Sequence, residues 1–65
     1  MKNHVIYIYD KKGRIICEMS FRTDEEANKI FDNLDLWKVG HHAVLGYYSK
    51  DIFQKIREKK SKEQY

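Results

Sequence analysis

The sequence predicts a small α+β domain in which a three-stranded, mainly antiparallel sheet packs against helices in the order β-β-α-β-α. Three observations lead to this fold class. Two β-branched and aromatic runs flank a turn, a capping motif opens an apolar stripe at helical spacing, and a third strand-like run follows. No repeat or linker interrupts the 65 residues, so we expect a single compact domain over residues 1–65.

Residues 4–9 and 14–21 form the predicted hairpin, because both runs are rich in residues that favour strands. Between them, Asp10 suits the first position of a type I turn and Gly13 the left-handed position that closes a bulged loop. Pairing Asp10 with Arg14 turns one set of side chains toward the core: Val5, Tyr7, Tyr9, Ile15, Cys17, Met19 and Phe21. The other face then carries a surplus of isoleucines, namely Ile6, Ile8 and Ile16. A slip of one residue would exchange the two faces of the first strand.

A helix is predicted to begin after Thr23, which suits an N-cap because Glu26 follows three residues later. Apolar residues then recur at helical spacing: Ala27, Ile30, Phe31, Leu34 and Trp37. Acidic and polar residues occupy the opposite face: Asp24, Asn28, Asp32 and Asp35. Gly40 is the expected stop, and residues 35–39 can already be irregular.

The C-terminal third is predicted to contain a strand over residues 41–48 and then a second helix. In the strand, Ala43, Leu45 and Tyr47 share one side, while His42, Val44, Gly46 and Tyr48 share the other. Gly46 suits a bulge or a close approach of two segments. Ser49 can cap the second helix, whose short apolar stripe is Ile52, Phe53 and Ile56. We expect a basic tail from about residue 58 to residue 65 to fray.

No catalytic, cofactor-binding or metal-binding motif is present in the sequence, which predicts that the protein is not an enzyme. His41 and His42 would point to opposite sides of a strand and could not chelate one ion. Cys17 is expected to be a small core residue. Asp32 and Asp35 lie three apart on the predicted helix, close enough for paired carboxylates, but a solvated acidic face is the expected role.

A cytoplasmic location is expected, because the first apolar run is too short for a signal peptide or a membrane span. The single cysteine excludes an internal disulfide. The net charge of +3 is unevenly distributed, since residues 23–36 carry five acidic groups and only Lys29 as a basic one. The molecule should therefore have an acidic and a basic face. The many lysines and the absence of proline are typical of an AT-rich genome.

Protein binding is the first functional hypothesis, with the chain acting as an inhibitor or adaptor from a phage or another mobile element. The acidic helix could imitate nucleic acid and occupy a nucleic-acid enzyme. Tyrosine and tryptophan are the residue types that dominate interfaces, with Tyr7 and Tyr47 assigned to the core. The expected interface residues are Asp24, Glu25, Asp32, Asp35, Trp37 and Tyr48. Exposed sheet edges and surplus isoleucines also predict a homodimer.

Direct nucleic-acid binding is the alternative, with single strands held by lysines beside the aromatic Tyr7, Tyr9 and Tyr48. It would use the hairpin tip and the end of the chain. The expected contact residues are Lys11, Lys12, Arg14, Lys55, Arg57, Lys59, Lys60 and Lys62. Lysines at a turn and near a chain end also serve solubility, and the acidic helix reduces the net positive field.

Overall fold

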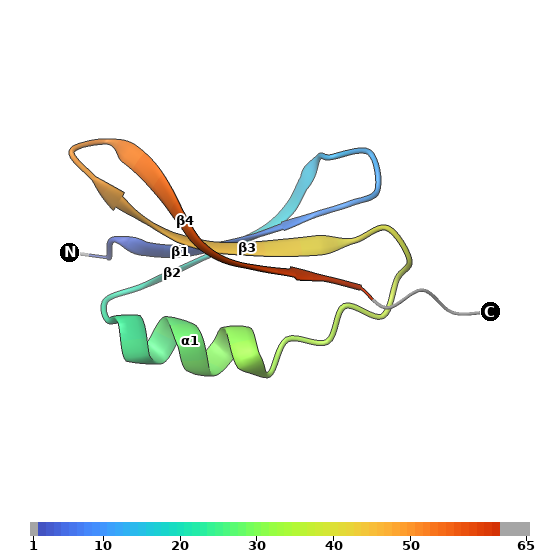
Figure 1. Cartoon of the computed structure of the whole chain (residues 1–65), viewed down its shortest axis with the longest axis horizontal. Helices are drawn as coiled ribbons and strands as arrows, with labels where there is room; N and C mark the ends of the chain where they lie inside the picture. The colour runs from blue at the N-terminus through green and yellow to red at the C-terminus, as the bar shows by residue number, and fades with distance from the viewer. Residues whose placement is uncertain (1, 62–65) are drawn as a thin grey trace.

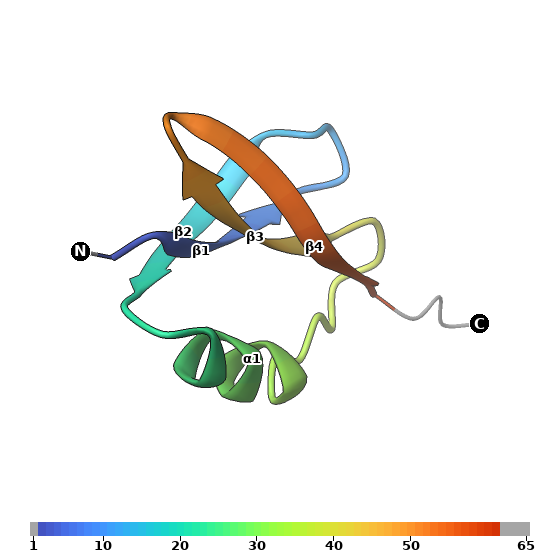
Figure 2. The same ribbon diagram turned by 60° about the vertical axis from the view of Figure 1, so that its left-hand side comes forward.

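The computed structural model describes residues 2–61 and shows a four-stranded antiparallel sheet with one helix, in the order β-β-α-β-β (Figure 1). The elements are β1 (His4–Tyr9), β2 (Ile15–Phe21), α1 (Asp24–Asp32), β3 (His42–Ser49) and β4 (Ile52–Lys60). The order of strands across the sheet is β2-β1-β3-β4. Helix α1 lies against one side of the twisted sheet, here called the helix side (Figure 2). The opposite side is called the open face.

The predicted β1–β2 hairpin is confirmed, including its turn. The Asp10 amide donates to the Arg14 carbonyl at 2.9 Å, and the Gly13 amide donates to the Asp10 carbonyl at 3.0 Å. Gly13 has a φ of 82°, the left-handed conformation that glycine adopts without a steric cost. The Asp10 carboxylate accepts from the amides of Lys12 and Arg14. These bonds, with that from Arg14 first, lower the pKa of Asp10.

The predicted inward face of the hairpin is wrong for β1 and for Ile15, which pairs with Tyr9 and is 54% exposed, and a β-bulge is the reason. Tyr9 lies opposite Ile15 as expected, but Ile8 lies opposite Cys17, so Ile16 is an extra residue on β2. Beyond this bulge Tyr7 faces Glu18 and Val5 faces Ser20. Ile6 and Ile8 consequently face the helix, with Cys17, Met19 and Phe21, whereas Val5, Tyr7 and Tyr9 lie on the open face.

Helix α1 begins as predicted and ends earlier than its apolar stripe. The Thr23 hydroxyl accepts a hydrogen bond from the Glu26 amide at 3.1 Å, which caps the first turn. The helix ends at Asp32, and residues 33–41 form an irregular loop in which Gly40 has a φ of 87°. Within residues 2–61, no helix has the length and apolar character needed to cross a membrane.

The predicted second helix is wrong, because residues 52–60 form strand β4. Lys50 and Asp51 have φ values of 52° and 67°, so a two-residue turn of the type I′ class joins β3 to β4. Ser49 lies opposite Ile52 as the first pair of this hairpin. The expected fraying from residue 58 is also wrong up to Lys60, which pairs with His42. Residues 62–65 lie outside the described part of the chain.

The core is small and lies between α1 and the two central strands. It consists of Ile6, Ala27, Phe31, Ala43 and Leu45, all between 0% and 1% exposed. Half-buried apolar residues extend it, namely Ile8, Met19, Phe21, Leu34 and Leu36. The two faces predicted for β3 are confirmed by its register, since Ala43 and Leu45 pair with Ile8 and Ile6 on the helix side.

Gly46 lies where residues of β4 come too close for a side chain, as the sequence suggested. A Cβ built on Gly46 would collide with the Phe53 ring and would lie 2.5 Å from the Gln54 carbonyl oxygen. The register between β3 and β4 also shifts between Leu45 and Gly46, which identifies a bulge. The position therefore requires the absence of a side chain.

We expect Gly46→Ala to lower the free energy of unfolding by about 1–3 kcal/mol, because the Gln54 backbone cannot move aside without breaking the strand pair. Urea unfolding followed by circular dichroism measures the change. Ser20→Ala is the control, since Ser20 is exposed on the same face, and its effect should stay within about 0.5 kcal/mol. Equal stability of Gly46→Ala and the wild type would contradict the close approach.

Candidate functional site

Two of the predicted nucleic-acid contacts on β4 reach back to helix α1 instead. Arg57 donates to the Asn28 side chain and to the Asp32 carboxylate, both at 2.7 Å. The Lys59 ammonium donates to the carbonyl oxygens of Phe31 at 2.7 Å and Leu34 at 3.1 Å. A cation at the C-terminal end of a helix also complements the helix dipole. Arg57 and Lys59 therefore hold α1 against the sheet.

The other predicted basic contacts do not form one continuous patch. Arg14 is paired with Asp10 at 3.0 Å, and Lys55 with Glu58 at 3.4 Å. Lys60 shares the open face with His42, its partner in the register. Lys11 and Lys12 are exposed in the β1–β2 turn. Lys62 lies outside the described residues.

The acidic helix is partly neutralised by contacts within the chain. Asp32 binds Arg57, and Asp24 lies 3.7 Å from the His4 ring and 3.0 Å from the Asn28 amide. Glu25 is exposed on the first turn, and Asp35 lies after the helix, in the loop. The four predicted acidic residues therefore do not form one uniform surface.

Aromatic side chains cover the open face, mostly on the two central strands. This aromatic face consists of Tyr7, Tyr9, His42, Tyr48 and Phe53, all half-buried. The rings contact one another: Tyr9 stacks on His42 at 4.7 Å, and Phe53 meets Tyr7 edge-on at 5.5 Å. Sequence reasoning missed Phe53 because it assigned that residue to a helix, although Asp51 is a residue type that tolerates the left-handed turn.

Tyr7 and Tyr48 are joined by a hydrogen bond between their hydroxyls at 2.7 Å. The bond to Tyr48, followed by partial burial, raises the pKa of Tyr7 to about 12. Tyr7, assigned to the core from the sequence, thus belongs to a second, smaller cluster on the open face. Tyr47, the other tyrosine assigned to the core, is half-buried on the helix side and stacks on His4 at 5.5 Å.

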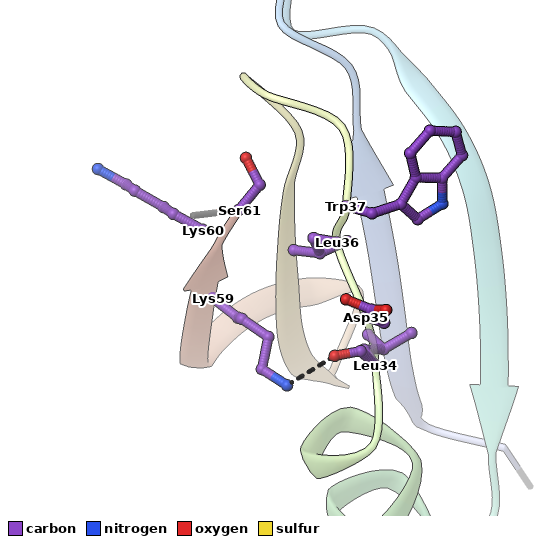
Figure 3. Close-up of a pocket in the computed structure, with 7 residues that line it drawn as sticks. All are labelled: Leu34, Asp35, Leu36, Trp37, Lys59, Lys60 and Ser61. Carbon is purple, nitrogen blue, oxygen red and sulfur yellow. Dashed lines mark hydrogen bonds between the residues drawn. The ribbon is translucent and has the colours of Figure 1, made fainter. Parts of the chain in front are cut away.

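Trp37 is the most exposed large apolar side chain among residues 2–61, at 72%. It ends the apolar stripe of the sequence, but it lies in the loop after α1 and not on the helix. Figure 3 shows Leu36 pointing toward β4 and the Trp37 indole pointing the other way, toward β1 and β2. The Lys38 ammonium lies 5.1 Å from the centre of the indole.

The loop of Trp37 leaves hollows on both sides. One, of about 540 Å³, lies between the loop and the end of β4 and includes Leu34, Leu36 and Lys59 (Figure 3). The other, of about 300 Å³, is here called the Trp37 hollow. Its lining consists of Ile8, Ile16, Cys17, Leu36, Trp37 and His41 together with the charged Asp35 and Lys38. It lies beside the outer strand β2, so it adjoins one edge of the sheet. Two sequence signals pointed toward it: Trp37, expected at an interface, and Ile16, one of the surplus isoleucines.

Cys17 is exposed, so its predicted core position is wrong. It points to the helix side, but the outer strand β2 is little covered at this end. His42 belongs to the aromatic face, while His41 precedes β3 and donates its amide to the Lys38 carbonyl. Among the residues described, no three His, Cys, Asp or Glu side chains are grouped to hold a metal ion. The absence of catalysis stays a prediction.

Comparisons with known proteins give no assignment: no family model, curated protein or solved structure matches the chain. The surfaces described above are therefore the basis on which a function can be proposed.

Lys59→Met should lower the free energy of unfolding by about 1–2 kcal/mol, because it keeps the aliphatic stem and removes the donor that binds the end of α1. Urea unfolding measures the loss. Lys60→Met is a matched control on the same strand, and it should change stability by less than about 0.5 kcal/mol. Equal effects of the two substitutions would show that the contact of Lys59 is not stabilising.

Stability should fall as the pH rises between 10 and 12, because the unfolded chain releases the Tyr7 proton while the folded chain keeps it. Below pH 10 this contribution is fully present. Tyr7→Phe should make the fall shallower, as measured by urea unfolding across that range. Tyr9→Phe removes a hydroxyl from the same face without breaking the Tyr7–Tyr48 bond and serves as the control. An unchanged slope in Tyr7→Phe would contradict the assignment.

Proposed function

We propose that the chain is a small, non-catalytic module that binds another protein, acting as an inhibitor or adaptor of the kind that phages and other mobile elements encode. The observation that carries this proposal is Trp37, 72% exposed beside the outer strand β2. Tryptophan is enriched among the residues that dominate binding energy at protein interfaces. Five of the seven residues of β2 are exposed as well, so the indole belongs to a wider accessible surface.

The exposed isoleucines support the same proposal. Ile15 and Ile16 are 54% and 51% exposed at the start of β2, and Val39 is 54% exposed in the loop of Trp37. Apolar area that stays accessible in a monomer is the area that gains most from burial against a partner. Imitation of nucleic acid by the acidic helix is less well supported, because Asp24 and Asp32 already have partners within the chain.

Single-stranded nucleic acid is a second candidate ligand, favoured by the aromatic face alone. Most of its rings lie on the central strands of an antiparallel sheet, an arrangement on which unpaired bases can stack. Charge argues against it. Arg57 and Lys59 are bound to the helix, and Glu18 and Glu58 lie on the open face among the lysines.

Affinity capture with the tagged full chain distinguishes the two candidates. We expect a defined protein that survives nuclease treatment, with at least about tenfold less recovered by Trp37→Ala, as read by mass spectrometry. Ile52→Ala is the control, because Ile52 is 63% exposed at the other edge of the sheet and should leave recovery unchanged.

Material that disappears with nuclease, binds less in high salt and depends on Tyr48 would contradict the protein-binding proposal. It would move the function to the aromatic face, since phosphate contacts weaken steeply with salt.

A further inference from the structure

The two edges of the sheet differ in how they are protected. Strand β4 carries a bulge and several lysines, features that discourage further strands from pairing with an edge. Strand β2 has its bulge at Ile16 and then runs in regular register from Cys17 to Phe21. It carries a single charged residue, Glu18. Within the described residues, β2 is therefore the edge that is better suited to accept another strand.

The Trp37 hollow lies directly beside this edge. Ile16 and Cys17 of β2 form one part of its lining, and Trp37 forms another. Its volume of about 300 Å³ is at the lower limit of small-molecule sites, so a single large apolar side chain suits it better than a cofactor. A strand added to β2 would direct alternate side chains to the helix side, where the hollow opens.

Positive charge flanks β2 at both ends. Arg14 precedes the strand, and its side chain is 72% exposed. Arg14 contacts Asp10, but this end stays basic because Lys11 and Lys12 are also exposed there. At the other end Arg22 and Lys2 border a hollow together with Ser20, Phe21 and the acidic Glu26, so the lining of this hollow keeps an excess of positive charge. A segment lying along β2 would meet basic groups at both of its ends.

We propose that the outer edge of β2 and the Trp37 hollow together bind an extended segment of the partner protein, which adds to the sheet as a fifth strand. The segment lies along the nine positions from Arg14 to Arg22 and pairs with the regular part of β2, from Cys17 to Phe21. It carries an apolar side chain for the hollow and Asp or Glu near each end. This inference depends on the proposed protein-binding function and specifies the partner's chemistry.

A second copy of the chain matches this edge less well. Full antiparallel overlap of two β2 strands, centred on Glu18, would place Glu18 against Glu18 and Arg14 against Arg22. Like charges directly opposite each other destabilise a strand pair. A segment of another protein with acidic ends would place a carboxylate near Arg14 and another near Arg22, so both arginines would be attracted instead of repelled.

A displayed library of random nonapeptides, selected on the immobilised full-length chain, tests the proposal. We expect the selected peptides to share an apolar residue and acidic ends. Binding should slow alkylation of Cys17, the only thiol in the chain, and slow amide exchange along β2. Failure to select any peptide, or selection of basic ones, would overturn the proposal. Protection confined to β4 or the aromatic face would do the same.

Variants make the test specific to this edge. Ile16→Lys and Trp37→Ala should each weaken the selected peptide by at least about tenfold. Ile56→Lys is the matched control, because Ile56 is 49% exposed and Ile16 is 51%, and it should stay within about twofold of wild type. Arg22→Glu should weaken acidic peptides and favour basic ones, a reversal that loss of folding could not produce.

Affinity capture and light scattering distinguish failure of the edge site from failure of the protein-binding function. One outcome is a protein partner that survives nuclease treatment, leaves the alkylation rate of Cys17 unchanged and is recovered equally by Ile16→Lys. That result would refute the edge site but not the protein-binding function. Recovery of nucleic acid alone would refute both. A dimer that Ile16→Lys converts to a monomer would show that a second copy of the chain binds this edge. It would contradict the proposal that the edge binds a segment of another protein.

Discussion

Packing of one helix against one side of the sheet is the contact on which the structure depends. Phe31 and Ala27 meet Ile6, Ala43 and Leu45, and these five residues are the whole fully buried cluster of the described chain. So small a core contributes little free energy, and domains of this size need further stabilising contacts. The cations of β4 supply some of them, because Arg57 and Lys59 bind α1 and also lie over the Phe31 ring.

The same constraint determines which surfaces remain for binding. A nine-residue helix leaves the open face and the β2 end of the helix side accessible. The aromatic rings of the open face partly cover one another, and their Tyr7–Tyr48 hydrogen bond satisfies two polar groups. The Trp37 indole contacts the Lys38 ammonium and still stays 72% exposed. The surface around Trp37 is therefore the better-supported binding site, because its apolar area is the least covered by other side chains of the chain.

The basic and acidic residues illustrate why charge alone is a weak guide to function. In the sequence Asp32 belongs to the acidic segment, whereas Arg57 and Lys59 belong to the basic run near the end of the chain. In the structure two of them form an ion pair and the third binds carbonyl groups. The Arg57–Asp32 pair places two opposite charges side by side, so it weakens both the predicted basic face and the predicted acidic face. Lys59 keeps its charge but holds it at the end of α1.

Sequence alone determined the features that depend on neighbouring residues: the Asp10–Gly13 turn, the Thr23 cap and the alternation of β3. Tertiary structure decided the rest. One inserted residue at Ile16 reversed the faces of β1, and a pattern of Ile52, Phe53 and Ile56 that fits a helix became a strand. Both outcomes depend on burial of Ile6 and on pairing with β3, energies that arise between segments distant in the chain and leave no local signal.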